Sequence, residues 1–211
     1  MYINLHTHNK QHNKGIAIYN LQLPNEKPNE LLCSAGLHPW HINLENYKDV
    51  IKKIKELARE KEVVAIGECG LDKICTTPFE LQKEVFKEQI AISEDVAKPI
   101  IIHCVKSYNE IIALKKEIKP LQTWIIHGFR GKAETAKMLS AAGIIVSIGE
   151  KFNSEIVQTI CSENIFIESD ESKRTIDEIY QNIADKWHIT SHELQERVEK
   201  LYKKVFVQKA R

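Results

Sequence analysis

The sequence predicts an α/β protein and, within that class, a (β/α)8 barrel of the TIM type. Apolar, β-branched runs of strand length alternate with stretches of helical spacing along most of the chain, and eight such runs can be counted. Six of them belong to units of a strand and a helix, which indicates a parallel sheet with right-handed crossovers. Eight parallel strands close most naturally into a barrel.

The first three expected strands follow one another without room for full helices. They cover Met1–His8, Gly15–Leu23 and Leu31–His38, with only the polar connections Asn9–Lys14 and Pro24–Glu30 between them. A crossover between parallel strands needs about a dozen residues. The chain has 211 residues, whereas ~250 is typical of this barrel. We therefore expect the first two crossover helices to be reduced or missing.

A barrel that lacks these helices leaves its outer wall bare beside the first two strands. An exposed apolar strip of that kind has to be covered. Either the C-terminal helix covers it, or a second subunit does so in a homodimer.

From residue 44 onward, expected helices and strands alternate regularly. The apolar residues Val50, Ile51, Ile54 and Leu57 recur with helical spacing, Gly143 is a typical helix stop, and Ser191 is a typical helix cap. The expected helices are Leu44–Lys61, Pro78–Val96, Ser107–Lys116, Gly131–Ala142, Ser154–Cys161, Thr175–Trp187 and Ser191–Val207. The expected strands are the one that opens at Val63, then Ile100–Val105, Thr123–Phe129, Ile144–Gly149 and Ile165–Asp170.

The stretch Val63–Asp72 is central to the functional interpretation. It begins as a buried strand and then places Glu68 between two glycines, Gly67 and Gly70. The glycines indicate a tight turn or a close approach of another segment. A carboxylate at the end of a buried strand is costly unless it is paired or bound to a cation. Glu68 is therefore the first candidate functional residue.

The amino-acid composition limits the classes of protein to which this chain can belong. Hydrophobic residues make up 43% and charged residues 28%, and the net charge is +1, which gives no electrostatic argument for nucleic acid. No apolar run approaches the ~18 residues of a membrane span, and no secretory signal is visible. The five cysteines are scattered without a C-x-x-C pair, which favours a reducing, cytoplasmic location. No repeat or linker appears, so we expect a single domain over residues 1–211.

Metal-ligating side chains stand where the expected strands end. In a (β/α)8 barrel these carboxyl ends surround one mouth, which holds the active site. Grouped imidazoles and carboxylates are typical ligands of divalent metals such as Zn, Mn or Mg. The residues concerned are His6 and His8 on the first strand, then His38, Glu68, His103, His127 and Asp170.

This set exceeds one tetrahedral site and suits two ions about 3.5–4 Å apart, the arrangement used for hydrolysis by a metal-activated water. Glu68 would bridge both ions. Asp170 either ligates or acts as general base toward the water. We assign one ion to His6, His8, Glu68 and Asp170, and the other to Glu68, His103 and His127.

Glu168 lies two residues before Asp170, on the same face of its strand. One interpretation is that it accepts the free N–H of a ligand histidine. The alternative is a buried structural ion pair.

The candidate residues stand in the motifs His6-x-His8, Gly36-Leu37-His38-Pro39, Ala65–Asp72, Pro99–Cys104, His127–Gly131 and Glu168-Ser169-Asp170. Together these motifs resemble the TatD family of metal-dependent hydrolases. The resemblance implies a (β/α)8 barrel with two or three divalent metals, Mg²⁺- or Zn²⁺-dependent DNase activity that includes 3′–5′ exonuclease action, and ligands at His6, His8, Glu68, His103, His127 and Asp170. Asn4 stands where the family usually has Asp, and Glu171–Arg174 replaces its Pro-rich loop.

We interpret the chain as a metal-dependent phosphodiesterase that acts on DNA ends or short single strands. His38 and the cations Lys106 and Arg130 are candidate substrate-binding residues, with Lys73 and Lys132 as further cations near strand ends; solvated rim charges are the alternative for all four cations. Trp40 either stacks on a base or packs under its own loop. Two competing hypotheses are an ester or amide hydrolase, such as a D-aminoacyl-tRNA deacylase, and a binding protein that retains metal without catalysis.

Overall fold

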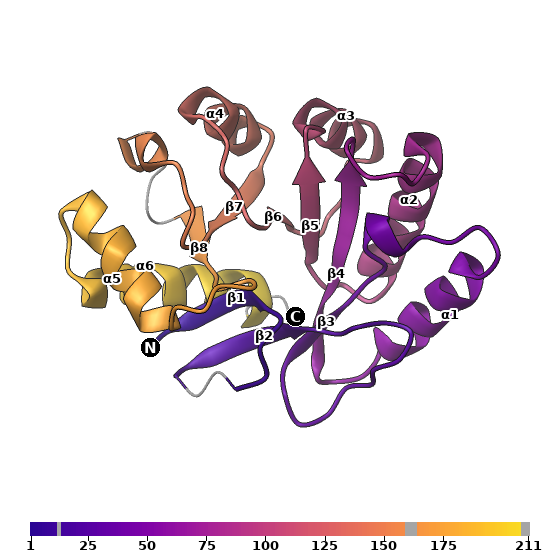
Figure 1. Ribbon diagram of the computed structural model, residues 1–211, viewed down its shortest axis with the longest axis horizontal. Helices are drawn as coiled ribbons and strands as arrows, with labels where there is room; N and C mark the ends of the chain where they lie inside the picture. Colours follow the sequence, from indigo (N-terminus) through magenta and orange to yellow (C-terminus); the bar gives the residue numbers. More distant parts are fainter. Residues whose placement is uncertain (12–13, 159–163, 208–211) are drawn as a thin grey trace. The chain divides into compact units, whose positions relative to one another are not determined.

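The computed structural model describes residues 1–11, 14–158 and 164–207. Cys161 and the end of the expected helix Ser154–Cys161 lie outside these residues. Eight parallel strands form one sheet in sequence order, β1 to β8 (Figure 1). This strand order, with β8 bridged to β1 between Asp170 and Thr7, is that of a (β/α)8 barrel, as expected. The strands are β1 Ile3–Thr7, β2 Ile16–Asn20, β3 Cys33–Ala35, β4 Val63–Asp72, β5 Ile100–Val105, β6 Trp124–Ile126, β7 Ile144–Ile148 and β8 Ile165–Ile167.

Helices follow most strands from β3 onward. The helix over residues 44–61 is shorter than expected, and α6 takes its N-cap from Thr190 instead of Ser191, since Thr190 and Glu193 form a capping box. The helices are α1 Tyr47–Leu57, α2 Phe79–Asp95, α3 Tyr108–Ile118, α4 Ala133–Ala141, α5 Ile176–Trp187 and α6 Ser191–Tyr202. Shorter turns are η1 Pro39–His41, η2 Ser154–Gln158 and η4 Lys203–Val207.

The chain divides into two compact units. Unit 1 comprises Met1–Tyr19 and Ile126–Arg211, and unit 2 comprises Asn20–Ile125. Within unit 1, β1 pairs with β2, and β7 pairs with β8. Within unit 2, β4 pairs with both β3 and β5. The expectation of a single domain over residues 1–211 stays a prediction.

The first two crossover helices are missing, as the connection lengths indicate. No helix occurs in residues 8–11 and 14–15 between β1 and β2, or in residues 21–32 between β2 and β3. Within unit 1, α6 packs against β1 and β8 and buries Leu194, Val198 and Leu201 (Figure 1). The C-terminal helix therefore covers β1, which was the first of the two expected solutions.

Tyr180 on α5 completes the attachment of β1. Its hydroxyl accepts the backbone N–H of Ile3 at 3.2 Å and donates to the carbonyl of Ile3 at 2.8 Å. A single side chain thus satisfies both polar backbone groups of one strand residue, as a neighbouring strand would.

Two glycines allow β4 to lie unusually close to β5. Gly67 has a φ of +134° and Gly70 a φ of +146°. A Cβ atom at Gly67 would lie 2.3 Å from the carbonyl oxygen of Ile101, and one at Gly70 would lie 2.1 Å from that of His103. Only glycine fits at either position. The expected close approach is confirmed.

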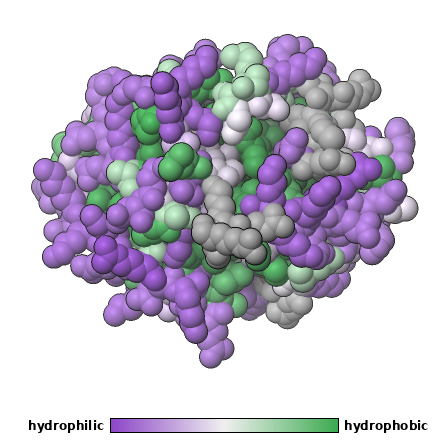
Figure 2. Space-filling view, turned by 180° about the vertical axis from the view of Figure 1, so that it is seen from behind, coloured by the Kyte–Doolittle hydropathy of each residue, from purple (hydrophilic) through white to green (hydrophobic). Residues whose placement is uncertain are grey.

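The surface is largely hydrophilic on the face drawn in Figure 2, where hydrophobic side chains appear between charged and polar ones. Among the described residues, every helix is too short or too polar to cross a membrane.

Candidate metal centre

The predicted ligands lie in two groups, one in each unit. In unit 1, the seam between β8 and β1 positions three of them. The backbone N–H of Asp170 donates to the carbonyl of His6 at 2.9 Å, and the N–H of His8 donates to the carbonyl of Asp170 at 3.3 Å. These two backbone hydrogen bonds place Asp170 beside His6 and His8. Asp170 adopts a left-handed backbone conformation (φ +50°), which Asp tolerates better than most residues.

The side chains of this group converge on one point. The Nε2 atoms of His6 and His8 lie 3.8 and 3.6 Å from Oδ1 of Asp170. The rings of His6 and His127 are 4.4 Å apart between centroids. His6, His127 and Asp170 each offer one ligand atom, and these atoms lie within 4.8 Å of one another. Two imidazole nitrogens and a carboxylate oxygen at this spacing fit a divalent cation.

Glu168 contacts one of these ligands from behind. Its side chain is fully buried, and its Oε1 accepts the N–H of Gly128 at 2.7 Å and lies 3.4 Å from Nδ1 of His127. Burial alone would raise the pKa of Glu168, but His127, His6 and Ser147 together outweigh burial and hold the pKa below its ordinary value. The carboxylate is therefore ionised beside His127, the geometry expected of a residue that orients a ligand histidine.

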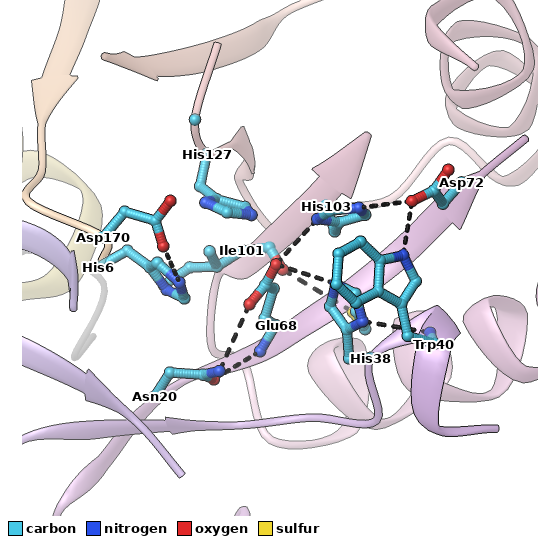
Figure 3. A network of polar contacts seen from close by, with 12 residues as sticks. His6, Asn20, His38, Trp40, Glu68, Asp72, Ile101, His103, His127 and Asp170 are labelled. Atoms are coloured by element: carbon cyan, nitrogen blue, oxygen red, sulfur yellow. Dashed lines mark hydrogen bonds and ion pairs between the residues drawn. The ribbon is translucent and has the colours of Figure 1, made fainter. Parts of the chain in front are cut away.

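In unit 2, Glu68 lies near the middle of β4 and is 6% exposed. Its Oε1 lies 2.9 Å from Nδ1 of His103 and 3.2 Å from Nε2 of His38 (Figure 3). The three side chains offer ligand atoms within 4.8 Å of one another. This second group also has the nitrogen and oxygen donors that a divalent cation requires.

His38 has one defined tautomer in this arrangement. Its Nδ1 accepts the backbone N–H of Trp40 at 3.1 Å, so that nitrogen carries no proton. Burial lowers the pKa of His38 and outweighs the opposing effect of Glu68, so the ring is neutral. The proton is on Nε2, which donates toward Glu68. His38 therefore faces Glu68 as a hydrogen-bond donor, while its role toward substrate stays a prediction.

Asn20 was missed as a candidate in the sequence. It ends β2, and its amide binds both the backbone and the side chain of Glu68: Oδ1 accepts the N–H of Glu68 at 3.0 Å, and Nδ2 donates to Oε2 at 3.4 Å. The expected strand Gly15–Leu23 extended three residues too far. An end at Asn20 would have placed a polar side chain at a strand tip, which was the signal used for six of the other strands.

Asp72 was also missed, although it lies within the stretch chosen as central. It is fully buried at the end of β4, and its Oδ2 lies 3.2 Å from Nε2 of His103 and accepts the indole N–H of Trp40 at 2.7 Å (Figure 3). Burial alone would raise the pKa of Asp72, but the hydrogen bonds from Trp40, Ile74 and His103 outweigh it and lower the pKa. A second acid at the end of a buried strand was the available signal.

Two buried glutamines on α2 fix the backbone beside these residues. Gln89 accepts the N–H of Leu37 at 2.7 Å and donates to its carbonyl at 3.1 Å. Gln82 does the same for Asp72, at 2.7 and 2.9 Å. Each amide satisfies both polar groups of one backbone residue, next to His38 in one case and at Asp72 in the other. Helix α2 is therefore the scaffold of the group in unit 2.

The candidate substrate-binding cations lie on the surface. Arg130 is exposed in unit 1 and lines a cavity of about 470 Å³ together with Asp170, Lys151 and Lys173. Lys106 is exposed directly after β5. Lys73 forms an ion pair with Glu110. The roles of Lys106 and Arg130 toward a substrate stay predictions.

Eight parallel strands with imidazole and carboxylate groups at their ends define the TIM-barrel class of metal-dependent hydrolases. Comparisons with known proteins support this class. A solved structure of YJJV, a TatD homologue from Escherichia coli k12, superposes with a TM-score of 0.72 at 19% identity, over 83% of this chain and 76% of that one. The family model described as TatD related DNase matches residues 4–207. The chain belongs to this family.

Curated relatives are similar over part of their length. A protein of Bacillus subtilis (strain 168) named "Uncharacterized metal-dependent hydrolase YabD" is 34% identical over 149 residues, which are 66% of this chain and 58% of that protein. A protein of Erwinia billingiae (strain Eb661) named "3'-5' ssDNA/RNA exonuclease TatD" is 33% identical over 129 residues, 60% of this chain and 49% of that protein. The chain thus matches about half of the length of these relatives.

Proposed function

We propose that this chain is a divalent-metal-dependent phosphodiesterase that removes nucleotides from the 3′ ends of single-stranded DNA. The observation that carries the proposal is the convergence of His6, His127 and Asp170 in unit 1 on one point. A similar group around Glu68 in unit 2 supports it. The names of relatives at about a third identity indicate the substrate class.

The ligand set favours two ions of Mg, Mn or Zn. The residues that would hold them are those assigned from the sequence: His6, His8, Glu68, His103, His127 and Asp170. When bound, such ions lower the pKa of water and stabilise the charge that develops on a phosphate.

The remaining chemistry belongs to side chains of this chain. Asp170 would accept a proton from the attacking water at its carboxylate. Glu168 keeps the ring of His127 in one orientation through its contact at Nδ1. His38 donates from Nε2 toward Glu68 and so fixes a carboxylate that would bind metal. Arg130 and Lys106 would bind flanking phosphates.

The test uses single-stranded DNA labelled at its 5′ end, incubated with Mg²⁺, Mn²⁺ or Zn²⁺. We expect a ladder of products shortened from the 3′ end, which chelation abolishes. Glu68→Gln and Asp170→Asn should each reduce the rate by a factor of 100 or more. Glu171→Gln, an exposed neighbour of Asp170, is the matched control and should retain activity.

Two outcomes would overturn the proposal. Release of an amino acid from a D-aminoacyl-tRNA without any DNA shortening would identify an ester hydrolase acting at carbon. Metal binding by calorimetry, with no turnover of either substrate, would identify a binding protein that retains metal.

A further inference from the structure

We propose that Trp40 is a stacking platform for a nucleobase of the substrate, held in a fixed orientation by Asp72. This inference rests on the proposed function, because it names how that site would hold a nucleic-acid strand. It begins from an unusual combination: the side chain of Trp40 is anchored by a buried group, yet the residue is 59% exposed. Large aromatic residues are highly buried on average.

The anchor is unusually complete. The indole N–H donates to Oδ2 of Asp72 at 2.7 Å, and the backbone N–H of Trp40 donates to Nδ1 of His38 at 3.1 Å. Asp72 is itself 0% exposed, and its Oδ1 accepts the N–H of Ile74 at 2.8 Å. Gln82 holds both backbone polar groups of Asp72. The indole therefore has little freedom to rotate.

The ring is fixed but not covered. Its contacts with other rings are nearly perpendicular: His38 lies at 5.1 Å with an interplanar angle of 90°, and His103 at 6.0 Å with an angle of 75° (Figure 3). Ile74, bound to the same carboxylate, is 63% exposed. Trp40 and Ile74 thus present apolar surface to solvent beside the group formed by His38, Glu68 and His103. Packing of Trp40 under its own loop, the alternative to stacking, does not occur.

This surface suits the flat face of a base. The only polar atom of the indole is already used by Asp72, so what remains for a ligand is stacking. Stacking tolerates any base, because every base has a π-face. A ring that is already fixed loses little conformational entropy when a partner binds. The platform would therefore bind strands with little preference for sequence.

The experiment compares two oligonucleotides, one with normal bases and one with abasic residues at its three 3′-terminal positions. We expect the wild type to prefer the normal strand, with the difference in KM. Trp40→Ala should raise KM for the normal strand roughly five- to hundred-fold and should abolish the preference. Trp40→Phe should restore most of it, and Ile74→Ala should reduce it slightly.

A purely structural role for Trp40 predicts a different result. Loss of support for Asp72 and His103 would lower kcat for both oligonucleotides equally and leave their ratio unchanged. An unchanged ratio in Trp40→Ala would overturn the proposal.

A second measurement needs neither turnover nor the alanine variant. Adenosine monophosphate should quench the tryptophan fluorescence of the wild type but not of Trp40→Phe, which retains Trp124 and Trp187. Equal quenching in both proteins would overturn the platform. Quenching that depends on Trp40, in a protein that fails to shorten DNA, would support the platform and refute only the phosphodiesterase.

Discussion

Glu168 lies 3.4 Å from Nδ1 of His127 and has no exposure to solvent. The buried carboxylate also accepts the N–H of Gly128 at 2.7 Å. The side chain of Glu168, which follows β8, thus contacts two consecutive residues of the segment that follows β6. A carboxylate in this position fixes the ring of a histidine and raises its basicity as a ligand.

Replacement of Glu168 by Gln should therefore weaken metal binding. The amide still fills the space and accepts one hydrogen bond, but it has no charge to stabilise the imidazole. We expect Mn²⁺ affinity to fall about 10- to 100-fold, measured by calorimetry. Glu171→Gln removes a charge from the same cavity without touching His127 and should bind as the wild type does. Equal affinities for both variants would contradict an orienting role.

The buried glutamines of α2 should increase the free energy of unfolding, because each one satisfies backbone groups that are otherwise unpaired. Gln89→Leu leaves the N–H and the carbonyl of Leu37 without their partner, and each unsatisfied buried group costs about 1–3 kcal/mol. We expect a loss of roughly 2–4 kcal/mol in the free energy of unfolding, measured by urea denaturation. The same change at the exposed Gln181 should cost less than about 0.5 kcal/mol. Similar losses at both positions would show that the pairing of Leu37 is unimportant.

A comparison of Gly70 in β4 with Gly128 tests the packing of the backbone more sharply. Gly70→Ala would place a Cβ atom 2.1 Å from the carbonyl oxygen of His103 and should destabilise the protein by roughly 2–4 kcal/mol. Gly128 also has a positive φ (+59°), but a Cβ there would meet only Oε1 of Glu168, at 3.7 Å. Gly128→Ala should therefore cost only about 1 kcal/mol. Thermal unfolding of both variants checks the order, and the reverse order would be inconsistent with the β4–β5 contact.

The ion pair between Asp177 and Lys14 should make stability depend on acid pH. Its atoms are 2.7 Å apart, and the hydrogen bonds from Lys14 and Thr175 hold the pKa of Asp177 below its ordinary value of 3.8. A carboxyl with a lowered folded pKa stabilises the fold above the pKa of the unfolded chain, and this contribution disappears as pH falls through the folded value. Asp177→Asn should therefore lower the urea midpoint at pH 7, and the difference should shrink and then vanish as the pH falls through the lowered pKa of the folded Asp177. Lys14→Gln should lower the urea midpoint in the same way at pH 7. If either variant still differs from the wild type in acid, the ion pair is not the cause of the difference.

The cysteines should differ in reactivity. Burial raises the pKa of Cys33 to about 12 and that of Cys104 to about 11, so almost no thiolate is present at pH 8. Cys75 is the least buried of the described cysteines. With iodoacetamide under native conditions, peptide mapping should find Cys75 modified before Cys33, Cys69 and Cys104. Labelling of Cys33 at the same rate would indicate that its strand opens readily.

Much of this arrangement could be predicted because strand ends are visible in the sequence. His6, Glu68, His103 and Asp170 each interrupt or end an apolar run, which marked them as candidates. Glu68 was expected at the end of its strand, but β4 continues to Asp72 and leaves Glu68 near its middle. Short connections likewise reveal missing helices, since a crossover has a minimum length.

The supporting residues could not be recognised in the same way. Asn20 can be recognised as a supporting residue only if the end of β2 is known. Strand boundaries are set by the pairing partner more than by local composition. Gln82 and Gln89 lie within an amphipathic helix, where glutamine is ordinarily a surface residue. Their role becomes apparent only when the backbone groups that they satisfy are known.

The division of the chain has a consequence for biosynthesis. Unit 2 is a single continuous segment and can form its β3–β4–β5 core while the rest is still being translated. Within unit 1, β1 has neither its Asp170 bridge nor its Tyr180 contact until residues 170 to 180 have left the ribosome. We therefore expect nascent β1 to expose apolar side chains for longer than β3–β5 do, and chaperone dependence to be concentrated in this strand.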